Sequence, residues 1–278
     1  MARVRLHDAR PPGPPPAGLA AAPAGWPAVL APLFSPGAAG VLARVADSEP
    51  SCHHPSERAA VGEAGLRRRR EFLAGRACAH AALRAVGRDG HPLGRGEERE
   101  PLWPAGVVGS ISHAEDLVGA VVAPAAAAWG VGLDIEPLAP PLDAAVERLV
   151  LAPAELARPP GPTARLAAHR TKIAFAAKEC VYKCLFPRTR WPLELRDVTV
   201  EIDDDRCRYH ALVDDRFRLA GLPLAPLEGR FTLLGGHVLV GLWIGAAGPV
   251  TASAAPGPGT DRSPRGRRPP RACSSACG

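Results

Sequence analysis

Residues 129–136, WGVGLDIE, carry two acidic side chains at the end of a short apolar run. The pattern predicts a β-strand, and because side chains alternate along a strand, Asp134 and Glu136 share one face. Leu133 and Ile135 can then enter a core on the opposite face. Two carboxylates spaced in this way lie roughly 7 Å apart, which suits one cation shared with a ligand, and hard oxygen ligands in small number favour Mg²⁺. An exposed acidic strand end before a proline explains the same spacing equally well.

A long helix is predicted further along the chain, over residues 163–186, and Pro187 is expected to stop it. It contains the segment FAAKECVYK at residues 175–183, in which Glu179 and Lys183 are four residues apart and share a helix face. A surface ion pair is the more common explanation of this spacing. The alternative interpretation places Glu179 beside a metal ion and the lysines on phosphate oxygens.

The lysines of this chain are few and clustered. Arginine outnumbers lysine 31 to 3, and the lysines all fall within twelve residues, at Lys172, Lys178 and Lys183. An ammonium group is a compact charge that the planar guanidinium of arginine does not replace. The cluster therefore favours a functional site in this helix over chance clustering.

A third segment, WPAGVVGSISH at residues 103–113, predicts a strand that ends in Ser112 and His113. Hydroxyl and imidazole groups are good donors to phosphate, although a lone histidine after a strand is more often structural. Upstream lies the run Arg67–Arg70, followed by Arg76. Four successive arginines usually form a solvated face, but guanidinium groups can also clamp a phosphate.

The rest of the chain alternates predicted helices and strands. Residues 57–86 predict a helix with a break near Gly62 or Gly65, and residues 142–151 predict a short one. The predicted strands are short and bounded by turn residues, and they cover residues 107–111, 117–122, 129–136, 195–202, 208–213 and 230–244. Gly235 and Gly236 divide the last run into a hairpin. This order indicates an α+β fold of two similar halves, each with one long helix on a small, mainly antiparallel sheet.

Proline content sets the expected limits of the folded region. Residues 1–25 are too rich in proline to pack and predict a disordered leader, and residues 246–278 predict a disordered tail of Pro, Arg and Ser. Between them we expect an N-terminal subdomain over residues 26–123 and a C-terminal subdomain with the acidic residues over residues 124–245.

The charge distribution argues against nucleic-acid binding. The formal net charge of +6 comes from the ends, because residues 251–278 carry +4 and residues 1–10 carry +2. The remainder is near neutral and only 5% of the chain is aromatic, whereas a nucleic-acid interface needs a basic folded surface. Seven cysteines without paired spacing and the lack of a long apolar run predict a reduced, cytoplasmic protein without a membrane span.

Taken together, these segments resemble the large, monomeric 4′-phosphopantetheinyl transferases, most closely the enterobactin-synthetase component D branch. The resemblance covers about residues 50–245. It is carried by Arg69-Arg70-Glu71-Phe72 and Gly75-Arg76-Ala77-Cys78-Ala79, and then by WPAGVVGSISH, GLDIE, FAAKECVYK and the RFTLLGGHVLVGLWI hairpin, in family order. It implies a pseudo-twofold α+β pair of subdomains with coenzyme A bound in the cleft between them.

The resemblance also implies roles for individual residues. The metal ligands would be Asp134, Glu136 and Glu179, which would hold Mg²⁺. Contacts to coenzyme A would come from Arg68, Arg76, Ser112, His113, Lys178 and Lys183, with Ser112 and His113 on the 3′-phosphate and Arg99 as a further candidate. Catalysis would rest on Glu179 as the base that deprotonates the acceptor serine and on Lys183, which offsets phosphate charge.

The implied reaction moves the 4′-phosphopantetheine arm of coenzyme A to a serine of an apo acyl- or peptidyl-carrier protein and releases 3′,5′-ADP. The implied partners are that carrier protein and coenzyme A, with a monomeric enzyme and neither nucleic acid nor membrane involved. Two rival functions use the same features. One is a metal-dependent phosphatase or nuclease acting on coenzyme A-like nucleotides, and the other is a basic nucleic-acid-binding protein.

Overall fold

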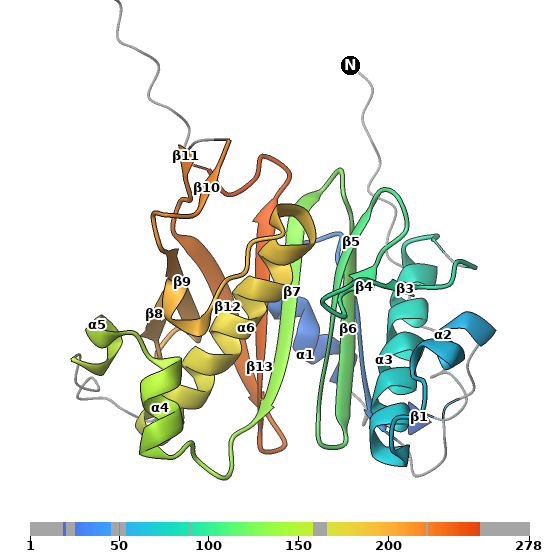
Figure 1. The fold of residues 1–278 in the computed structure, drawn as a ribbon, viewed down its shortest axis with the longest axis horizontal. Coiled ribbons are helices and arrows are strands. Elements are labelled where there is room, and N and C mark those ends of the chain that lie inside the picture. The colour runs from blue at the N-terminus through green and yellow to red at the C-terminus, as the bar shows by residue number, and fades with distance from the viewer. Residues whose placement is uncertain are drawn as a thin grey trace, which may run out of the picture.

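A computed structural model describes residues 19–20, 26–45, 50, 54–88, 90–157, 166–220 and 222–250. The fold is α+β, as predicted, with helices against antiparallel sheets (Figure 1). Its two halves are alike, because each places one 20-residue helix on one antiparallel sheet. Among the described residues no helix is both long and apolar enough to cross a membrane.

The first half is built around helix α3. Its elements are β1 Leu19–Ala20, α1 Trp26–Leu30, η1 Ala31–Leu33, β2 Ala39–Val45, α2 Pro55–Ala60, α3 Leu66–Ala85, β3 Gly94–Arg95, β4 Pro101–Leu102, β5 Val107–Ala114 and β6 Leu117–Pro124. The strand order of its main sheet is β1-β2-β6-β5. The buried side of α3 is rich in alanine, and it packs on Val118 and Val122 of β6, because small side chains let a helix lie close to a sheet.

The second half repeats this plan around helix α6. Its elements are β7 Ala128–Pro137, α4 Ala144–Val150, α5 Pro153–Leu156, η2 Ala167–His169, α6 Arg170–Thr189, η3 Leu195–Asp197, β8 Val198–Asp203, β9 Arg208–Val213, β10 Arg218–Leu219, β11 Leu222–Pro223, β12 Leu227–Leu234 and β13 His237–Gly245. The strand order of its main sheet is β7-β13-β12-β9-β8. The predicted hairpin is confirmed, and both of its turn glycines, Gly235 and Gly236, have positive φ.

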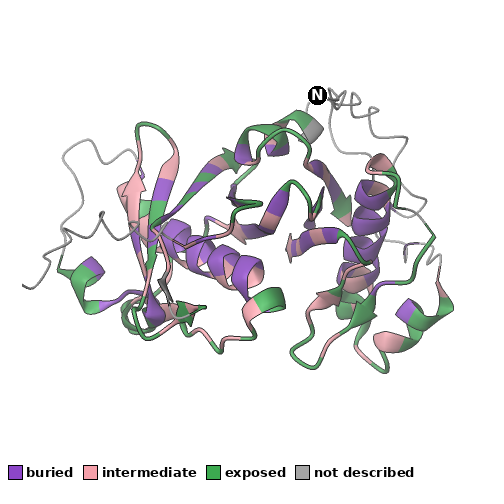
Figure 2. Ribbon diagram, turned by 90° about the horizontal axis from the view of Figure 1, so that it is seen from above, coloured by how far each residue is buried: buried purple, intermediate pink, exposed green. Residues whose placement is uncertain are grey.

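The two halves meet where strand β5 lies beside β7 (Figure 1). Side-chain hydroxyls make the connection between the strands. The Leu133 amide donates to Ser110 Oγ at 3.0 Å, and the Ile135 amide donates to Ser112 Oγ at 3.2 Å. Helices α3 and α6 cover the same side of the joined sheets, and α1 lies on the other side (Figure 2). There Leu30 and Leu33 pack into a core that both halves share.

Several local predictions are confirmed and several need correction. The break between α2 and α3 falls at Gly62 and Gly65, and β5, β6, β7 and β9 follow the predicted runs. Pro187 does not stop α6, which continues to Thr189. Arg190 then caps the helix in a left-handed conformation, and its amide donates a hydrogen bond to the Phe186 carbonyl. A proline removes only one helical hydrogen bond, and near a helix end that loss is small. Residues 195–197 form a 3₁₀ turn rather than the start of a strand.

The expected disordered ends need correction at two places. Strand β1 lies within the predicted leader, where Leu19 is buried and pairs with Val45. Val250, in the predicted tail, forms a bridge with Leu224. Residues 1–18, 21–25 and 251–278 lie outside the described residues, as does the predicted helix start at residues 163–165. The predicted boundary between subdomains, at residues 123 and 124, falls at the end of β6, and this division stays a prediction.

Candidate active site

The candidate site depends on how closely helix α6 approaches strand β7. A Cβ atom on Gly132 would lie 2.2 Å from the carbonyl oxygen of Cys180, and one on Gly130 would lie 2.9 Å from that of Cys184. These two glycines therefore let the helix backbone rest on the strand, where any side chain would push it away. As a result, Glu179 and Lys183 of α6 come next to the acidic end of β7.

The strand register places the acidic residues toward α6, as their alternation predicted. Asp134 pairs with Val240 and Glu136 pairs with Val238, and both valines belong to the core beneath α6. The intervening Leu133 and Ile135 enter the core on the opposite side. One local rule, the two-residue period of a strand, thus orients both carboxylates.

Asp134 is the centre of a buried hydrogen-bond network. It is only 2% exposed, and its Oδ1 accepts from Lys183 Nζ at 2.5 Å and from Ser112 Oγ at 2.9 Å. Lys183 Nζ also donates to Ser112 Oγ at 3.1 Å. Asp134 Oδ2 is buried and has no hydrogen-bond partner among the described residues. Since a buried polar atom without a partner is costly, this oxygen is suited to a cation.

The electrostatics show that three carboxylates share this site. Burial and the charges of Asp134 and Glu179 raise the pKa of Glu136 to about 7, against the opposing effect of Lys172 and Lys183. Burial and the charge of Asp134 likewise raise the pKa of Glu179. Burial alone would lower the pKa of Lys183, but Asp134 and Glu179 outweigh it and raise that pKa. Mutual repulsion of this kind favours a bound cation.

The oxygen atoms of these three carboxylates nevertheless do not all lie close to one another. Among the described residues, the one group of three whose ligand atoms lie within 4.8 Å of one another is elsewhere, at Glu115, Asp116 and His237. Asp134, Glu136 and Glu179 are therefore spaced more widely. Mg²⁺ is usually bound by one or two carboxylates and completed by water and substrate phosphates, so the donor types fit that ion, and the carboxylates must move closer together for all three to bind it.

Two other predicted residues, Arg68 and His113, lie together at one side of the site. Arg68 Nη1 is 2.7 Å from His113 Nε2, and Glu71 Oε2 lies 3.7 Å from both His113 Nδ1 and Arg68 Nη1. Burial lowers the pKa of His113, and the charges of Arg68 and Lys183 lower it further, while Glu71 opposes the shift. Our sequence analysis missed the role of Glu71 in holding this pair, although its position three residues after Arg68 on a helix was a usable signal.

Lys178 requires a correction. The resemblance implied that Lys178 contacts a phosphate of coenzyme A. The structure shows Lys178 only 1% exposed, and its Nζ donates to Glu155 Oε2 at 2.5 Å and to the Val150 carbonyl at 2.7 Å. Lys178 and Lys183 are five positions apart, which turns their side chains about 140° from one another on a helix. Lys178 therefore points toward α5, away from Asp134, and forms an internal ion pair.

Arg76 is also enclosed by the protein. It is buried, its Nη2 donates to the Gly94 carbonyl at 3.2 Å, and its guanidinium lies 4.9 Å from the centre of the Phe72 ring. These contacts tie α3 to β3. The expected contact of Arg76 with the nucleotide has no further support here and stays a prediction.

A cavity of about 180 Å³ lies between the two halves. One wall is formed by the loop from Glu98 to Pro101 and by β5, and the other by Glu179, Tyr182 and Lys183 of α6. Arg99 lines this cavity and is exposed. The cavity therefore lies next to the predicted catalytic residues Glu179 and Lys183. Arg99, a further predicted contact to coenzyme A, borders it.

Comparison with known proteins agrees with this geometry. Residues 56–123 match the 4′-phosphopantetheinyl transferase N-terminal domain, and residues 130–220 match the 4′-phosphopantetheinyl transferase superfamily. The chain is 32% identical over 198 residues to the 4′-phosphopantetheinyl transferase Npt of Nocardia iowensis, covering 68% of this chain and 88% of the relative. It is 34% identical to the 4′-phosphopantetheinyl transferase PptT of Mycobacterium tuberculosis, covering 68% and 84%.

A third relative is enterobactin synthase component D of Salmonella typhi, which is 38% identical over 149 residues and covers 50% of this chain and 56% of the relative. An α+β pair of halves with an acidic, lysine-containing site between them thus coincides with family matches in both halves. The chain belongs to the 4′-phosphopantetheinyl transferase family and is an enzyme of that class.

Proposed function

We propose that this enzyme transfers the 4′-phosphopantetheine arm of coenzyme A to a serine of an apo acyl- or peptidyl-carrier protein, giving the holo-carrier and 3′,5′-ADP. The observation that carries the proposal is the convergence of Asp134, Glu179 and Lys183 where the two halves meet. In this proposal the phosphopantetheine end of coenzyme A reaches these groups through the cavity beside them. Family membership supplies the reaction class.

The metal ligands in this proposal are Asp134, Glu136 and Glu179. Their support is the buried, unpartnered Asp134 Oδ2 and the raised pKa values of the two glutamates. When bound, Mg²⁺ would withdraw charge from the pyrophosphate oxygens of coenzyme A. Binding of the ion would also keep all three carboxylates ionised.

Glu179 is proposed as the general base. Its carboxylate has two oxygens, so one can hold the ion while the other accepts the proton of the serine hydroxyl. The serine hydroxyl loses its proton to Glu179, the serine oxygen forms a bond to the β-phosphorus of coenzyme A, and the bond from that phosphorus to the bridging oxygen breaks. The electron pair leaves with 3′,5′-ADP, so no covalent enzyme intermediate is needed.

Lys183 is proposed to stabilise charge on the phosphates. Its pKa is raised by Asp134 and Glu179, so the ammonium stays protonated. A fixed cation at the reacting phosphates lowers the barrier because most catalysis of phosphoryl transfer is electrostatic. Arg68 and His113 are proposed to bind the 3′-phosphate. Arg68 supplies the charge there, since the lowered pKa of His113 favours the neutral imidazole.

The wider setting of the enzyme is part of the proposal. We propose that it acts as a monomer in the cytoplasm and needs neither membrane nor nucleic acid.

The test is to incubate the protein with an apo-carrier, coenzyme A and Mg²⁺ and to measure the intact mass of the carrier. We expect the carrier to gain one phosphopantetheine group, and Glu179→Gln and Asp134→Asn to lower the rate by about 100-fold or more. Reactions without Mg²⁺ and without carrier are the controls. Full activity of either variant, or release of 3′,5′-ADP from coenzyme A without a carrier, would contradict the proposal.

A further inference from the structure

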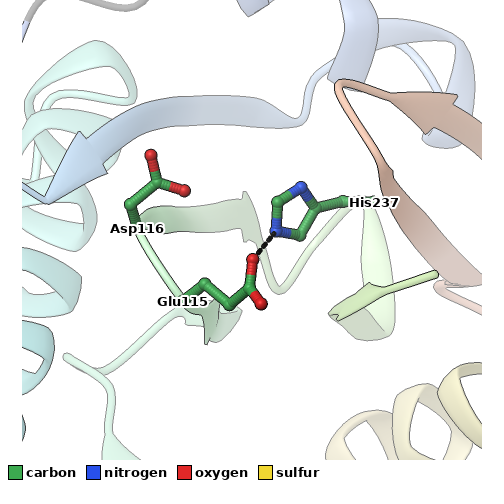
Figure 3. A group of neighbouring side chains, drawn as sticks. All are labelled: Glu115, Asp116 and His237. Atoms are coloured by element: carbon green, nitrogen blue, oxygen red, sulfur yellow. Dashed lines mark ion pairs between the residues drawn. The ribbon is translucent and has the colours of Figure 1, made fainter. Parts of the chain in front are cut away.

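A second cluster of potential metal ligands lies outside the site described above. Glu115 and Asp116 form the two-residue turn between β5 and β6, and His237 begins β13. Each residue offers one ligand atom, and these atoms all lie within 4.8 Å of one another. Figure 3 shows the imidazole of His237 facing the carboxylate of Glu115. The cluster thus joins a turn of the first half to a hairpin of the second.

The hydrogen bonding of His237 prepares one ring nitrogen for a cation. Its Nδ1 lies 3.2 Å from the Gly235 carbonyl, which can only accept, so Nδ1 carries the proton. In the neutral ring Nε2 then keeps its lone pair. A backbone carbonyl on the other ring nitrogen is the usual arrangement for a metal-binding histidine.

The surroundings of His237 Nε2 do not satisfy it. The side chain is only 8% exposed, and Nε2 is buried without a hydrogen-bond partner among the described residues. It points at Glu115 Oε2, 3.4 Å away. A lone pair on this buried nitrogen that faces a carboxylate oxygen is unfavourable unless a positive charge, either a proton or a metal ion, lies between them.

The cluster is separate from the catalytic carboxylates. Val238 lies beneath α6 on the same face as its partner Glu136, whereas Leu239 lies in the core on the other face. Since side chains alternate, His237 belongs with Leu239 and points away from Glu136. The two groups of ligands therefore occupy opposite faces of the β7–β13 pair.

The chemistry of the three ligands favours a particular class of ion. One imidazole and two carboxylates suit Zn²⁺ and related transition metals, whereas Mg²⁺ prefers oxygen ligands alone. Asp116 Oδ2 is paired with Arg44, which orients the carboxylate. Zn²⁺ ligands at tetrahedral angles lie about 3.3 Å apart, so the cluster must contract, and the exposed Glu115 side chain is free to rotate inward.

We propose that Glu115, Asp116 and His237 bind a divalent transition-metal ion, with Zn²⁺ as the preferred ion and water completing its coordination. The ion links the β5–β6 turn to the β12–β13 hairpin and so fastens the two halves whose junction forms the active site. This metal site is additional to the proposed transferase function and does not depend on it.

The test uses the full chain without a histidine tag, stripped of metal and titrated with Zn²⁺ by calorimetry. We expect one tight site per chain and a higher melting temperature with Zn²⁺. Glu115→Gln and His237→Gln should each weaken binding by about tenfold or more and remove the shift in melting temperature. His210→Gln, at an exposed histidine of β9, is the matched control and should bind as the unaltered chain does.

Two results would overturn the proposal. One is Zn²⁺ binding of equal affinity in Glu115→Gln and His237→Gln, which would assign the ion to cysteines or histidines elsewhere. The other is no Zn²⁺ binding by the unaltered chain, which would leave a metal-free pair of His237 and Glu115. If His237→Gln fails to fold, Glu115→Gln decides the question, because its exposed side chain is not needed for packing.

Discussion

Gly132 and Cys180 are in such close contact that a Cβ atom on Gly132 would lie 2.2 Å from the Cys180 carbonyl oxygen. Cys180 directly follows the proposed base Glu179, and Gly132 lies two residues before Asp134. The missing side chain therefore sets the separation between the two elements that carry the site.

Replacing Gly132 by alanine should accordingly separate helix from strand. We expect Gly132→Ala to destabilise the fold by about 3 kcal/mol and to lower kcat by about 100-fold, because a shift near 1 Å misplaces the reacting groups. Urea unfolding and the carrier mass assay measure the two effects. Gly245→Ala, at a β13 position with nothing within 4 Å, is the control and should change stability by less than about 0.5 kcal/mol. A stable, fully active Gly132→Ala enzyme would refute the argument.

Ser112 connects the two halves and also orients Asp134. Its hydroxyl donates to Asp134 Oδ1 and accepts from the Ile135 amide and from Lys183. We expect Ser112→Ala to cost about 2 kcal/mol, because a buried amide loses its partner, and to lower kcat by about tenfold while KM for coenzyme A changes little. These positioning contacts differ from the phosphate contact that the family resemblance implies.

The matched control for this prediction is Ser110→Ala. Ser110 binds the Leu133 backbone in the same way but has no hydrogen bond to Asp134. It should lose similar stability with kcat within about twofold, as expected of a contact outside the reacting groups. If Ser112→Ala instead raises KM for coenzyme A at unchanged kcat, the hydroxyl contacts the phosphate and the positioning role is wrong.

Lys178 should matter for stability rather than for substrate binding. Burial lowers the pKa of Lys178, and its hydrogen bond with Glu155 opposes that shift. Lys178→Met strands the Glu155 carboxylate in the interior, so we expect a loss of about 3 kcal/mol with KM for coenzyme A unchanged. Lys183→Met is the comparison, and it should reduce kcat/KM strongly. A stable Lys178→Met enzyme with a greatly raised KM for coenzyme A would instead support the predicted contact between Lys178 and a phosphate.

The pH dependence of stability should reflect Glu57, which lies buried between α2 and α3. Burial raises the pKa of Glu57, but the hydrogen bonds that its carboxylate accepts from His80 at 2.8 Å and from the Leu93 amide at 2.6 Å outweigh burial and bring the pKa below the ordinary value of 4.5. A group whose pKa is depressed by folding stabilises the fold above its unfolded pKa, and this contribution disappears as pH falls through the folded pKa.

The free energy of unfolding should therefore differ most between the unaltered chain and Glu57→Gln above pH 4.5. We expect a difference of about 3 kcal/mol near neutral pH, shrinking steadily as pH falls below that value. Urea unfolding of both proteins across the acid range measures it. A difference that does not change with pH would assign the effect to packing rather than to the charge of Glu57.

Much of the fold was predictable because the signals are local. The alternation of residues 133–136 predicted which face the carboxylates occupy, and the double glycine at residues 235–236 predicted the hairpin. Strand β2 was missed, since it is flanked by proline-rich sequence and pairs only with distant β1 and β6. The start of α6 was predicted too early because helical propensity does not fix where a helix begins.

The site was predictable in its residue types but not in all its contacts. Glu179, Lys183 and Asp134 converge as the motifs indicated. Lys178 could not be assigned from the motif, because its partner Glu155 belongs to α5, a short helix that sequence analysis did not predict. The partners of His113 likewise come from α3, 42 to 45 residues earlier in the chain.

The sequence by itself determined the periodicities, the turn positions and the chemical types of the acidic and basic groups, because each depends on residues only a few positions apart. The tertiary structure alone decided which of these groups meet. His237 lies more than 120 positions after the adjacent Glu115 and Asp116, yet the packing of two sheets brings the ligand atoms of the three residues together. Such contacts depend on strand register and helix phase, which are fixed only when the whole core packs.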